Sequence, residues 1–204
     1  FYGKIEENEL KILIIEYIEG DILINFIKKR KNYLSFSLKH RIIFQIITTV
    51  EFIHSNGIIL RDLKDDNIII DSDKNSIFID FDQTHIIGSE TQTLSHKHDM
   101  TGDIGSLYYT AHEQFSTNNY STKVDIYSLG MIIHLIVTEM QYSFDPIEIF
   151  EINKAKQENL LNFNEIPKCP PEYKHLCNIY KDFLEYLPES RPDINQVTKS
   201  MINY

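Results

Sequence analysis

The chain has 204 residues, with 20 Lys and Arg against 30 Asp and Glu, which gives a formal net charge of -10. This length suits one globular domain with a real core, and a hydrophobic content of 42% argues against general disorder. An acidic chain without a basic aromatic stripe suits neither nucleic acid nor an anionic membrane surface, so neither is an expected partner. Its longest apolar run near the middle, residues 131–137, is too short to span a bilayer. Two cysteines predict reduced thiols and a cytoplasmic location.

The first third of the chain predicts a hairpin and two helices. Residues 1–17 predict a β-hairpin, because two apolar stretches flank a polar, turn-like segment. Residues 20–31 predict a short amphipathic helix that opens at the Gly-Asp pair. Ser37 is the expected N-cap of a longer helix with isoleucines on one face, and Gly57 is expected just past its end.

The rest of the chain predicts a second hairpin and then mostly helix. Two apolar runs, residues 68–70 and 77–79, flank a polar turn, whereas residues 83–103 lack periodicity and predict a mobile loop. Four helices are predicted, which begin near Lys123, Pro146, Pro171 and Pro192. The helix from Lys123 is expected to end at Thr138 and to be buried. A small sheet followed by mostly helix predicts an α+β fold.

Residues 60–67, Leu-Arg-Asp-Leu-Lys-Asp-Asp-Asn, carry the most chemistry. They place Asp62, Lys64 and Asn67 on one short loop, and the hairpin that follows delivers Asp80 thirteen residues after Asn67. A single Asp can orient a hydroxyl and accept its proton, and a Lys can neutralise charge on a moving phosphoryl group. Asn and Asp oxygens are suitable ligands for Mg²⁺. The spacing therefore predicts phosphoryl transfer, with Asp62 and Lys64 catalytic and Asn67 and Asp80 at the metal.

Three later motifs follow in order: Gly-Ser-Leu-Tyr-Tyr-Thr-Ala-His-Glu at 105–113, Asp-Ile-Tyr-Ser-Leu-Gly at 125–130 and Pro-Glu-Ser-Arg-Pro at 188–192. Together with the 60–67 loop and Asp-Phe-Asp at 80–82, they resemble the ordered motifs of serine/threonine protein kinases, over essentially the whole chain. The resemblance implies a protein-kinase-like fold with two parts. Residues 1–20 would be a remnant of the small lobe, its last two strands and the hinge. Residues 21–204 would form the mostly helical lobe.

The resemblance also implies how the activation segment is held. Glu113 and Arg191 are expected to form a buried ion pair that anchors this segment to the helical lobe, and Asp125 is a further anchor position. The guanidinium of Arg61 is expected to grip a phosphate on the mobile loop. The sequence does not choose among four candidate phosphate acceptors in that loop, Thr91, Thr93, Ser95 and Thr101.

Nucleotide contacts are implied by the same resemblance. Ile15 would stand at the gatekeeper position, the backbone of Glu16 and Ile18 would meet the adenine edge, and Ile69 would lie beneath the ring. Lys64 implies serine/threonine specificity. The expected cofactors are thus ATP and Mg²⁺, and the expected partners are protein substrates with Ser or Thr acceptors.

The sequence departs from the family pattern at Leu60 for the usual His, Asp82 for Gly and His112 for Pro. Asp82 is the departure expected to matter most, because Gly permits backbone conformations that cost other residues. The glycine-rich phosphate loop, the lysine strand and the helix that carries the partner Glu are missing from the chain. We therefore expect the isolated chain to bind ATP weakly and to transfer little phosphate.

Two other functions are alternatives. One is a pseudokinase, a kinase fold that binds partners. Leu60, Asp82 and the missing small lobe favour it, whereas the retained Asp62, Lys64, Asn67 and Asp80 oppose it. The other is a small-molecule phosphotransferase of the aminoglycoside or choline kinase type, which the run Ile-Asp-Phe-Asp at 79–82 fits. Those enzymes generally lack the motifs found within residues 105–130, and this decides against the second alternative.

Overall fold

A computed structural model of the chain describes residues 2–7, 10–31, 33–88, 108–116, 121–139 and 174–202. The fold is α+β and mostly helical, as predicted. The expected helices from Pro146 and Pro171 begin outside the described residues. The four candidate phosphate acceptors also lie outside them. Among the described residues, no helix is both long enough and apolar enough to cross a membrane.

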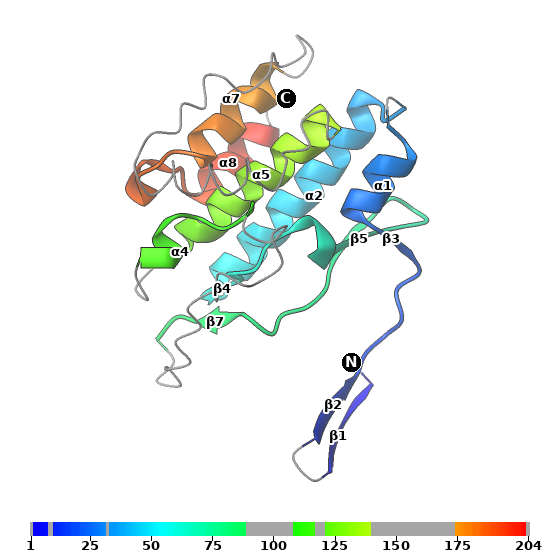
Figure 1. The fold of residues 1–204 in the computed structure, drawn as a ribbon. Helices are drawn as coiled ribbons and strands as arrows, with labels where there is room; N and C mark the ends of the chain where they lie inside the picture. Colours follow the sequence, from blue (N-terminus) through cyan, green and yellow to red (C-terminus); the bar gives the residue numbers. More distant parts are fainter. Residues whose placement is uncertain are drawn as a thin grey trace.

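Helix α5, Lys123–Thr138, lies at the centre of the helical body, and its predicted bounds are confirmed (Figure 1). All of its residues from Val124 to Val137 are buried, which is typical of a helix that is hydrophobic all round. Leu129 and Ile133 are 0% and 1% exposed, so the prediction of a buried central helix is confirmed.

The described residues contain five other helices and two 3-10 turns. They are α1 Leu23–Lys29, α2 Phe36–Ser55, α4 Glu113–Ser116, α7 Lys174–Phe183 and α8 Ile194–Ile202, with 3-10 turns η1 Asp65–Asn67 and η4 Pro188–Ser190. Helix α5 packs against α7, and α2 packs against both α5 and α8. Gly130 allows the close approach of α5 and α7, because a Cβ there would lie 2.8 Å from Cβ of Phe183.

In the described part of the chain, seven short strands form three small antiparallel sheets. The strands are β1 Gly3–Glu7, β2 Leu10–Ile14, β3 Gly20–Ile22, β4 Ile58–Ile59, β5 Ile68–Asp71, β6 Ser76–Phe78 and β7 His85–Ile86. Strand β1 pairs with β2, β5 lies between β3 and β6, and β4 pairs with β7. Both predicted hairpins are therefore confirmed.

The predicted helix start at Gly20 is wrong. Residues Gly20–Ile22 form β3, which pairs with β5 through Gly20 opposite Asp71 and Ile22 opposite Ile69. A Cβ at position 20 would lie 2.5 Å from the carbonyl oxygen of Ile70, so the glycine serves close strand packing. The helix begins three residues later, at Leu23. The local pattern could not show a strand partner some fifty positions away.

The ends of α2 are fixed by side-chain and backbone capping. Its N-cap is Ser35 and not the predicted Ser37, because Oγ of Ser35 accepts a hydrogen bond from the N–H of Leu38 at 3.3 Å. Ser37 lies in the first turn, where its Oγ is 3.1 Å from that of Ser35. Gly57 follows the helix as predicted, with φ 70°, and its N–H donates to the carbonyl of His54 at 3.0 Å.

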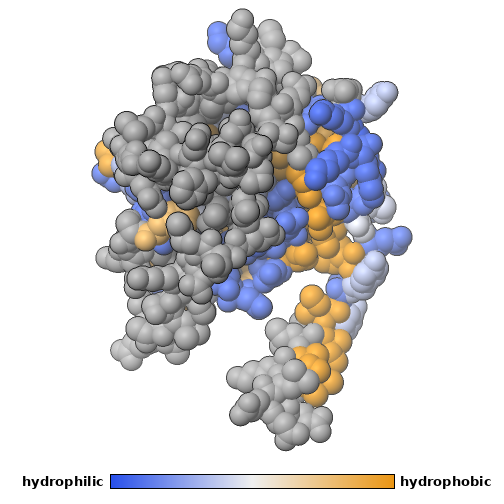
Figure 2. Space-filling model, viewed as in Figure 1, coloured by the Kyte–Doolittle hydropathy of each residue, from blue (hydrophilic) through white to orange (hydrophobic). Residues whose placement is uncertain are grey.

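The first hairpin, β1–β2, stands away from the helical body, to which the extended residues 15–19 connect it (Figure 1). Among the side chains that the structure describes, the buried core begins at Leu23, and none of it comes from the hairpin. Ile5, Ile12 and Ile14 of the hairpin are 47%, 42% and 43% exposed. Figure 2 shows the hydrophobic surface that results on the hairpin.

Candidate active site

The loop that carries Asp62 is held to the core by its apolar residues. It leaves β4, which pairs with β7, and runs into the turn η1. Leu60 and Leu63 are 6% and 3% exposed, whereas the side chains of Asp62 and Lys64 are each 19% exposed. Leu60 thus packs in the core in place of the His expected from the family pattern. The loop thus buries its leucines, whereas Asp62 and Lys64 remain partly exposed.

Three predicted site residues meet at the carboxylate of Asp62. Nζ of Lys64 lies 2.7 Å from Oδ2 of Asp62, and Nδ2 of Asn67 donates to the same oxygen at 3.2 Å. Nδ2 of Asn67 also donates to the backbone carbonyl of Asp62 at 2.9 Å. These contacts fix the direction of a carboxylate that remains partly open to solvent. Such a group is suited to accept a proton from a bound hydroxyl.

Asp80 arrives beside this cluster through the β5–β6 hairpin. The N–H of Ile79 donates to the carbonyl of Asn67 at 2.9 Å, so Asp80 follows directly on the residue that pairs with Asn67. Asp80 is exposed and has φ 61°, and its Oδ1 accepts the N–H of Asp82 at 3.2 Å. Asp82 is not among the described non-glycine residues with positive φ, so the loss of glycine there causes no strain of that kind.

The donors at this point fit magnesium. The Nδ2 atom of Asn67 is directed at Asp62, which turns its Oδ1 away from that residue. An amide oxygen together with the Asp80 carboxylate gives the hard donors that Mg²⁺ takes, and Mg²⁺ commonly completes its shell with water and phosphate oxygens. The described residues contain no group of three or more His, Cys, Asp or Glu side chains that could hold a metal without such help.

Asp125, at the start of α5, holds the backbone just before Asp62. Its side chain is completely buried, and it accepts the N–H of Leu60 at 2.8 Å and that of Arg61 at 2.9 Å. Nε2 of His54, from the last turn of α2, lies 2.8 Å from the same carboxylate. Sequence reasoning identified Asp125 as an anchor position but missed His54, because helical periodicity gives no sign of a contact between two helices.

The guanidinium of Arg61 contacts the backbone of the turn just before β7. Its Nε donates to the carbonyl of Gln83, and Nη2 donates to that of Thr84 at 3.4 Å. Its backbone adopts φ 67°, which is uncommon for a non-glycine residue. The expected grip on a loop phosphate involves residues outside the described ranges, so it stays a prediction.

Asp65 and Tyr109 connect the loop to the segment at 108–113. Asp65 is 7% exposed, and burial, followed by repulsion from Asp66, raises the pKa of its carboxyl above the ordinary value. A hydrogen bond from the Tyr109 side chain opposes that rise. Burial also raises the pKa of the Tyr109 hydroxyl well above its usual value. The backbone carbonyl of Tyr109 accepts the hydroxyl of Ser128 on α5 at 2.8 Å.

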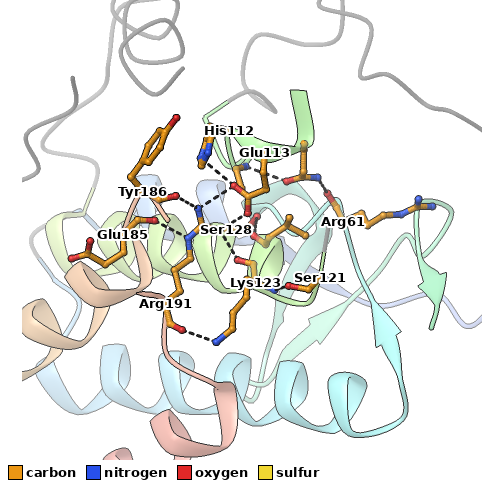
Figure 3. Close-up of polar contacts among 12 residues, drawn as sticks. Arg61, His112, Glu113, Ser121, Lys123, Ser128, Glu185, Tyr186 and Arg191 are labelled. Carbon is orange, nitrogen blue, oxygen red and sulfur yellow. Dashed lines mark hydrogen bonds and ion pairs between the residues drawn. The ribbon is translucent and has the colours of Figure 1, made fainter. Parts of the chain in front are cut away.

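The predicted ion pair between Glu113 and Arg191 is present (Figure 3). Nη1 and Nη2 of Arg191 lie 2.5 Å and 3.1 Å from the two carboxylate oxygens, and the Arg191 side chain is fully buried. The remaining donors reach the carbonyls of Glu185, Tyr186 and Lys123 at 2.8, 3.1 and 2.9 Å. All five guanidinium N–H groups are thus satisfied, which is what a buried arginine requires.

His112, where the family pattern has Pro, joins this ion pair. Its ring stacks on Tyr186 with centroids 4.0 Å apart, and its Nδ1 lies 3.1 Å from Oε2 of Glu113 (Figure 3). The substitution therefore adds an aromatic and a polar contact at the position where a proline ring would stiffen the turn.

The residues predicted to contact adenine lie on two elements. Ile15, Glu16 and Ile18 belong to the extended segment between β2 and β3, where Ile15 is 62% exposed and Ile18 is half-buried. Ile69 is half-buried on β5, opposite Ile22 of β3. These four assignments stay predictions.

Comparison with known proteins matches residues 1–201 to the protein kinase domain. The mouse protein named hormonally up-regulated neu tumor-associated kinase is 27% identical over 185 residues, 90% of this chain and 25% of that protein. The probable serine/threonine-protein kinase nek2 of Dictyostelium discoideum is 28% identical over 192 residues, 91% of this chain and 43% of that protein. The probable serine/threonine-protein kinase KIN1 homolog of Enterocytozoon bieneusi is 33% identical over 151 residues, 72% and 24% respectively. This chain thus spans roughly a quarter to two fifths of these relatives.

Proposed function

Because the chain belongs to the protein kinase domain family, we propose that it acts in a serine/threonine protein kinase that transfers the γ-phosphoryl group of ATP to protein hydroxyls. The observation that carries this proposal is the Asp62 carboxylate, fixed by Lys64 and Asn67 on a loop whose backbone is held by Asp125. A binding scaffold needs no such oriented carboxylate. Similarity to serine/threonine kinases supports the choice of acceptor.

The loop residues would each have one role. Asp62 would orient the substrate hydroxyl and accept its proton as the new P–O bond forms and ADP leaves. Lys64 would steady the negative charge of the transferred group from its place beside Asp62. Magnesium, when bound, would neutralise the phosphate oxygens, and Asn67 and Asp80 would be its protein ligands.

The remaining residues would bind the nucleotide and hold the activation segment. Ile15, Glu16, Ile18 and Ile69 would surround the adenine ring, as the resemblance implies. Four further residues would anchor the activation segment and its neighbouring loop, and these are Arg61, Glu113, Asp125 and Arg191. The buried pair of Glu113 with Arg191 supports that assignment.

We also propose that residues 1–20 are the remnant of the small lobe with the hinge, and that residues 21–204 are the helical lobe. The separation of the first hairpin from the body and the start of the buried core at Leu23 support this division. The two cysteines of the chain, too few for a disulfide framework, support a cytoplasmic location.

The test is a phosphoryl-transfer assay on the protein that the gene encodes, with labelled ATP and a generic substrate rich in Ser and Thr. Asp62→Asn should abolish transfer, because an amide does not accept the proton. Asp80→Asn should raise the magnesium concentration needed for half-maximal rate. Asp73→Asn, an exposed carboxylate in the β5–β6 turn, is the matched control and should leave the rate unchanged.

A wild-type protein that transfers no phosphate and binds no magnesium nucleotide would instead support the pseudokinase alternative. In that outcome Asp82 is the first residue to examine, and Asp82→Gly is the variant to make. Transfer to an aminoglycoside or to choline, without transfer to protein, would point to the small-molecule phosphotransferase alternative.

A further inference from the structure

The backbone of Arg61 is held from both sides. Its φ of 67° is unusual for a residue with a side chain, and it immediately precedes Asp62. Its N–H donates to Oδ1 of Asp125 at 2.9 Å, and its carbonyl accepts Nε2 of Gln114 at 3.1 Å. That carbonyl belongs to the peptide unit that joins Arg61 to Asp62. Gln114 therefore contacts the backbone that carries Asp62.

The surroundings of Gln114 hold its side chain in the position that this contact requires. It is 6% exposed, in the short helix α4, and follows Glu113 of the buried ion pair. Its Oε1 accepts the N–H of Ala111 at 3.1 Å, while the N–H of Gln114 itself donates to the carbonyl of Ala111 at 3.0 Å. The Oε1 atom of the Gln114 amide thus meets a donor, and its Nε2 atom meets an acceptor. The two contacts together determine the orientation of the amide group.

We propose that Gln114 is a positioning residue for phosphoryl transfer, and this proposal rests on the function proposed above. Glu113 is tied to Arg191, so α4 is a fixed base from which Gln114 reaches the Arg61–Asp62 peptide. Asp125 restrains the N–H side of Arg61 and Gln114 the carbonyl side. Together they keep an uncommon backbone conformation in place. The position of the activation-segment end is thereby transmitted to Asp62.

Two substitutions of Gln114 distinguish a positioning role in catalysis from a purely structural role. Gln114→Met keeps the size of the side chain but removes both hydrogen bonds. Gln114→Glu keeps an acceptor for Ala111, but its ionised form does not donate to the Arg61 carbonyl, whereas its protonated form does. The matched control is Gln196→Met, because Oε1 of Gln196 accepts the N–H of Asp193 at 3.3 Å near the start of α8, far in sequence from Arg61.

In the full protein we expect Gln114→Met to lower kcat at least about tenfold, a change that corresponds to about 1.4 kcal/mol of transition-state stabilisation. The KM for ATP should stay within about twofold, because the contact orients Asp62 and not the nucleotide. For Gln114→Glu, the ratio of its kcat to that of wild type should rise as the pH falls from 8 to 6. For Gln114→Met this ratio should stay flat. Gln196→Met should behave as wild type.

Amide hydrogen exchange supplies a readout that does not need activity. The peptide that contains residues 60–63 should exchange faster in Gln114→Met than in wild type, with no such change in Gln196→Met. Wild-type kcat in a folded Gln114→Met, or unchanged exchange at residues 60–63, would overturn the proposal. If Gln114→Met does not fold, the pH dependence of Gln114→Glu decides. An inactive wild type would refute the proposed kinase function, and exchange would still test the contact.

Discussion

Asp125, Ser128 and Gly130 belong to the motif at residues 125–130, and each of them makes a different tertiary contact. Asp125 accepts two backbone N–H groups of the loop before Asp62, and Ser128 donates to the backbone of Tyr109. Gly130 leaves room for Phe183 of α7. The motif thus joins the loop before Asp62, the segment that contains Tyr109 and helix α7 through the first half of α5. The spacing of these three motif residues therefore corresponds to three separate contacts made by one helix.

The buried ion pair gives the first prediction. Arg191→Ala should lower the free energy of unfolding by about 3–5 kcal/mol, because Glu113 is left buried without its cation. The control is Lys29→Ala. Lys29 pairs with Asp21 at 2.5 Å, but its side chain is 63% exposed, so the loss of stability should be far smaller. Urea unfolding measures both. Equal losses in the two variants would contradict the assigned importance of the buried pair.

The second prediction concerns His134, which lies in α5 and is 5% exposed. Burial lowers the pKa of its imidazole from 6.5 to about 4. Between these pH values the unfolded chain binds a proton that the folded chain does not, so stability is lost as the pH falls from 6.5 toward 4. The full loss is about 3 kcal/mol, because each pH unit of pKa difference corresponds to about 1.4 kcal/mol.

His134→Leu should remove this part of the pH dependence of unfolding. Ile133→Val is the control, since it should destabilise the same helix by about 1 kcal/mol and leave the pH dependence intact. Asp65 contributes with the opposite sign, because its raised pKa favours folding at lower pH. The comparison therefore rests on the difference between each variant and wild type. A His134→Leu protein with the wild-type slope would disprove the assignment.

At the scale of elements, a second buried ion pair fastens the end of α5 to α2. Nζ of Lys39 lies 2.6 Å from Oε1 of Glu139 and donates to the carbonyl of Val137 at 3.1 Å. The Lys39 and Glu139 side chains are only 4% and 8% exposed. Glu139 has φ 50°, a left-handed conformation at the end of a helix that glycine adopts most easily. The lysine thus also satisfies a carbonyl at the helix end.

Lys39→Met should therefore destabilise the protein by about 3 kcal/mol or more, because it leaves the carboxylate of Glu139 buried without that ammonium group. The double variant Lys39→Met with Glu139→Gly should recover much of this loss, since glycine suits the backbone and carries no charge. Thermal or urea unfolding of both single variants and the double variant completes the cycle. Additive losses would argue against a coupled pair.

The helices and strands also show which of their bounds can be predicted from local sequence pattern. The bounds of α5 and the presence of both hairpins could be predicted, because periodic apolar residues and polar turns determine them over short distances. The start of α1 could not, because β3 exists only through pairing with β5. Ser35 and Ser37 are equally good N-caps by residue type. Which of them caps α2 depends on where the chain enters the helix, and sequence pattern does not determine that.

At the scale of the whole molecule, the first hairpin and the helical body are distinct. The body has the buried core, and the hairpin is joined to it by extended residues (Figure 1). A chain without residues 1–14 should therefore unfold cooperatively with a Tm within a few degrees of that of the 204-residue chain. Removal of residues 194–204 should abolish cooperative unfolding, because α8 packs against α2 and contributes Ile194, Val197 and Met201 to the core.

Circular dichroism during heating measures both truncations. Loss of the transition on removal of the hairpin would show that the hairpin supports the body, contrary to this prediction.

The amino-acid sequence was enough to recognise the family and to predict which residues carry the chemistry, because motif spacing indicates which side chains come from the same loop or helix. The spacing predicted Asp62, Lys64, Asn67 and Asp80 as one group, and the family resemblance implied the pairing of Glu113 with Arg191. Only the tertiary structure decided what holds that group in place, through the contacts of His54, Gln114 and Tyr109. Those contacts join segments that are distant in sequence, and no local preference of the chain specifies them. Packing of the helical body brings them together.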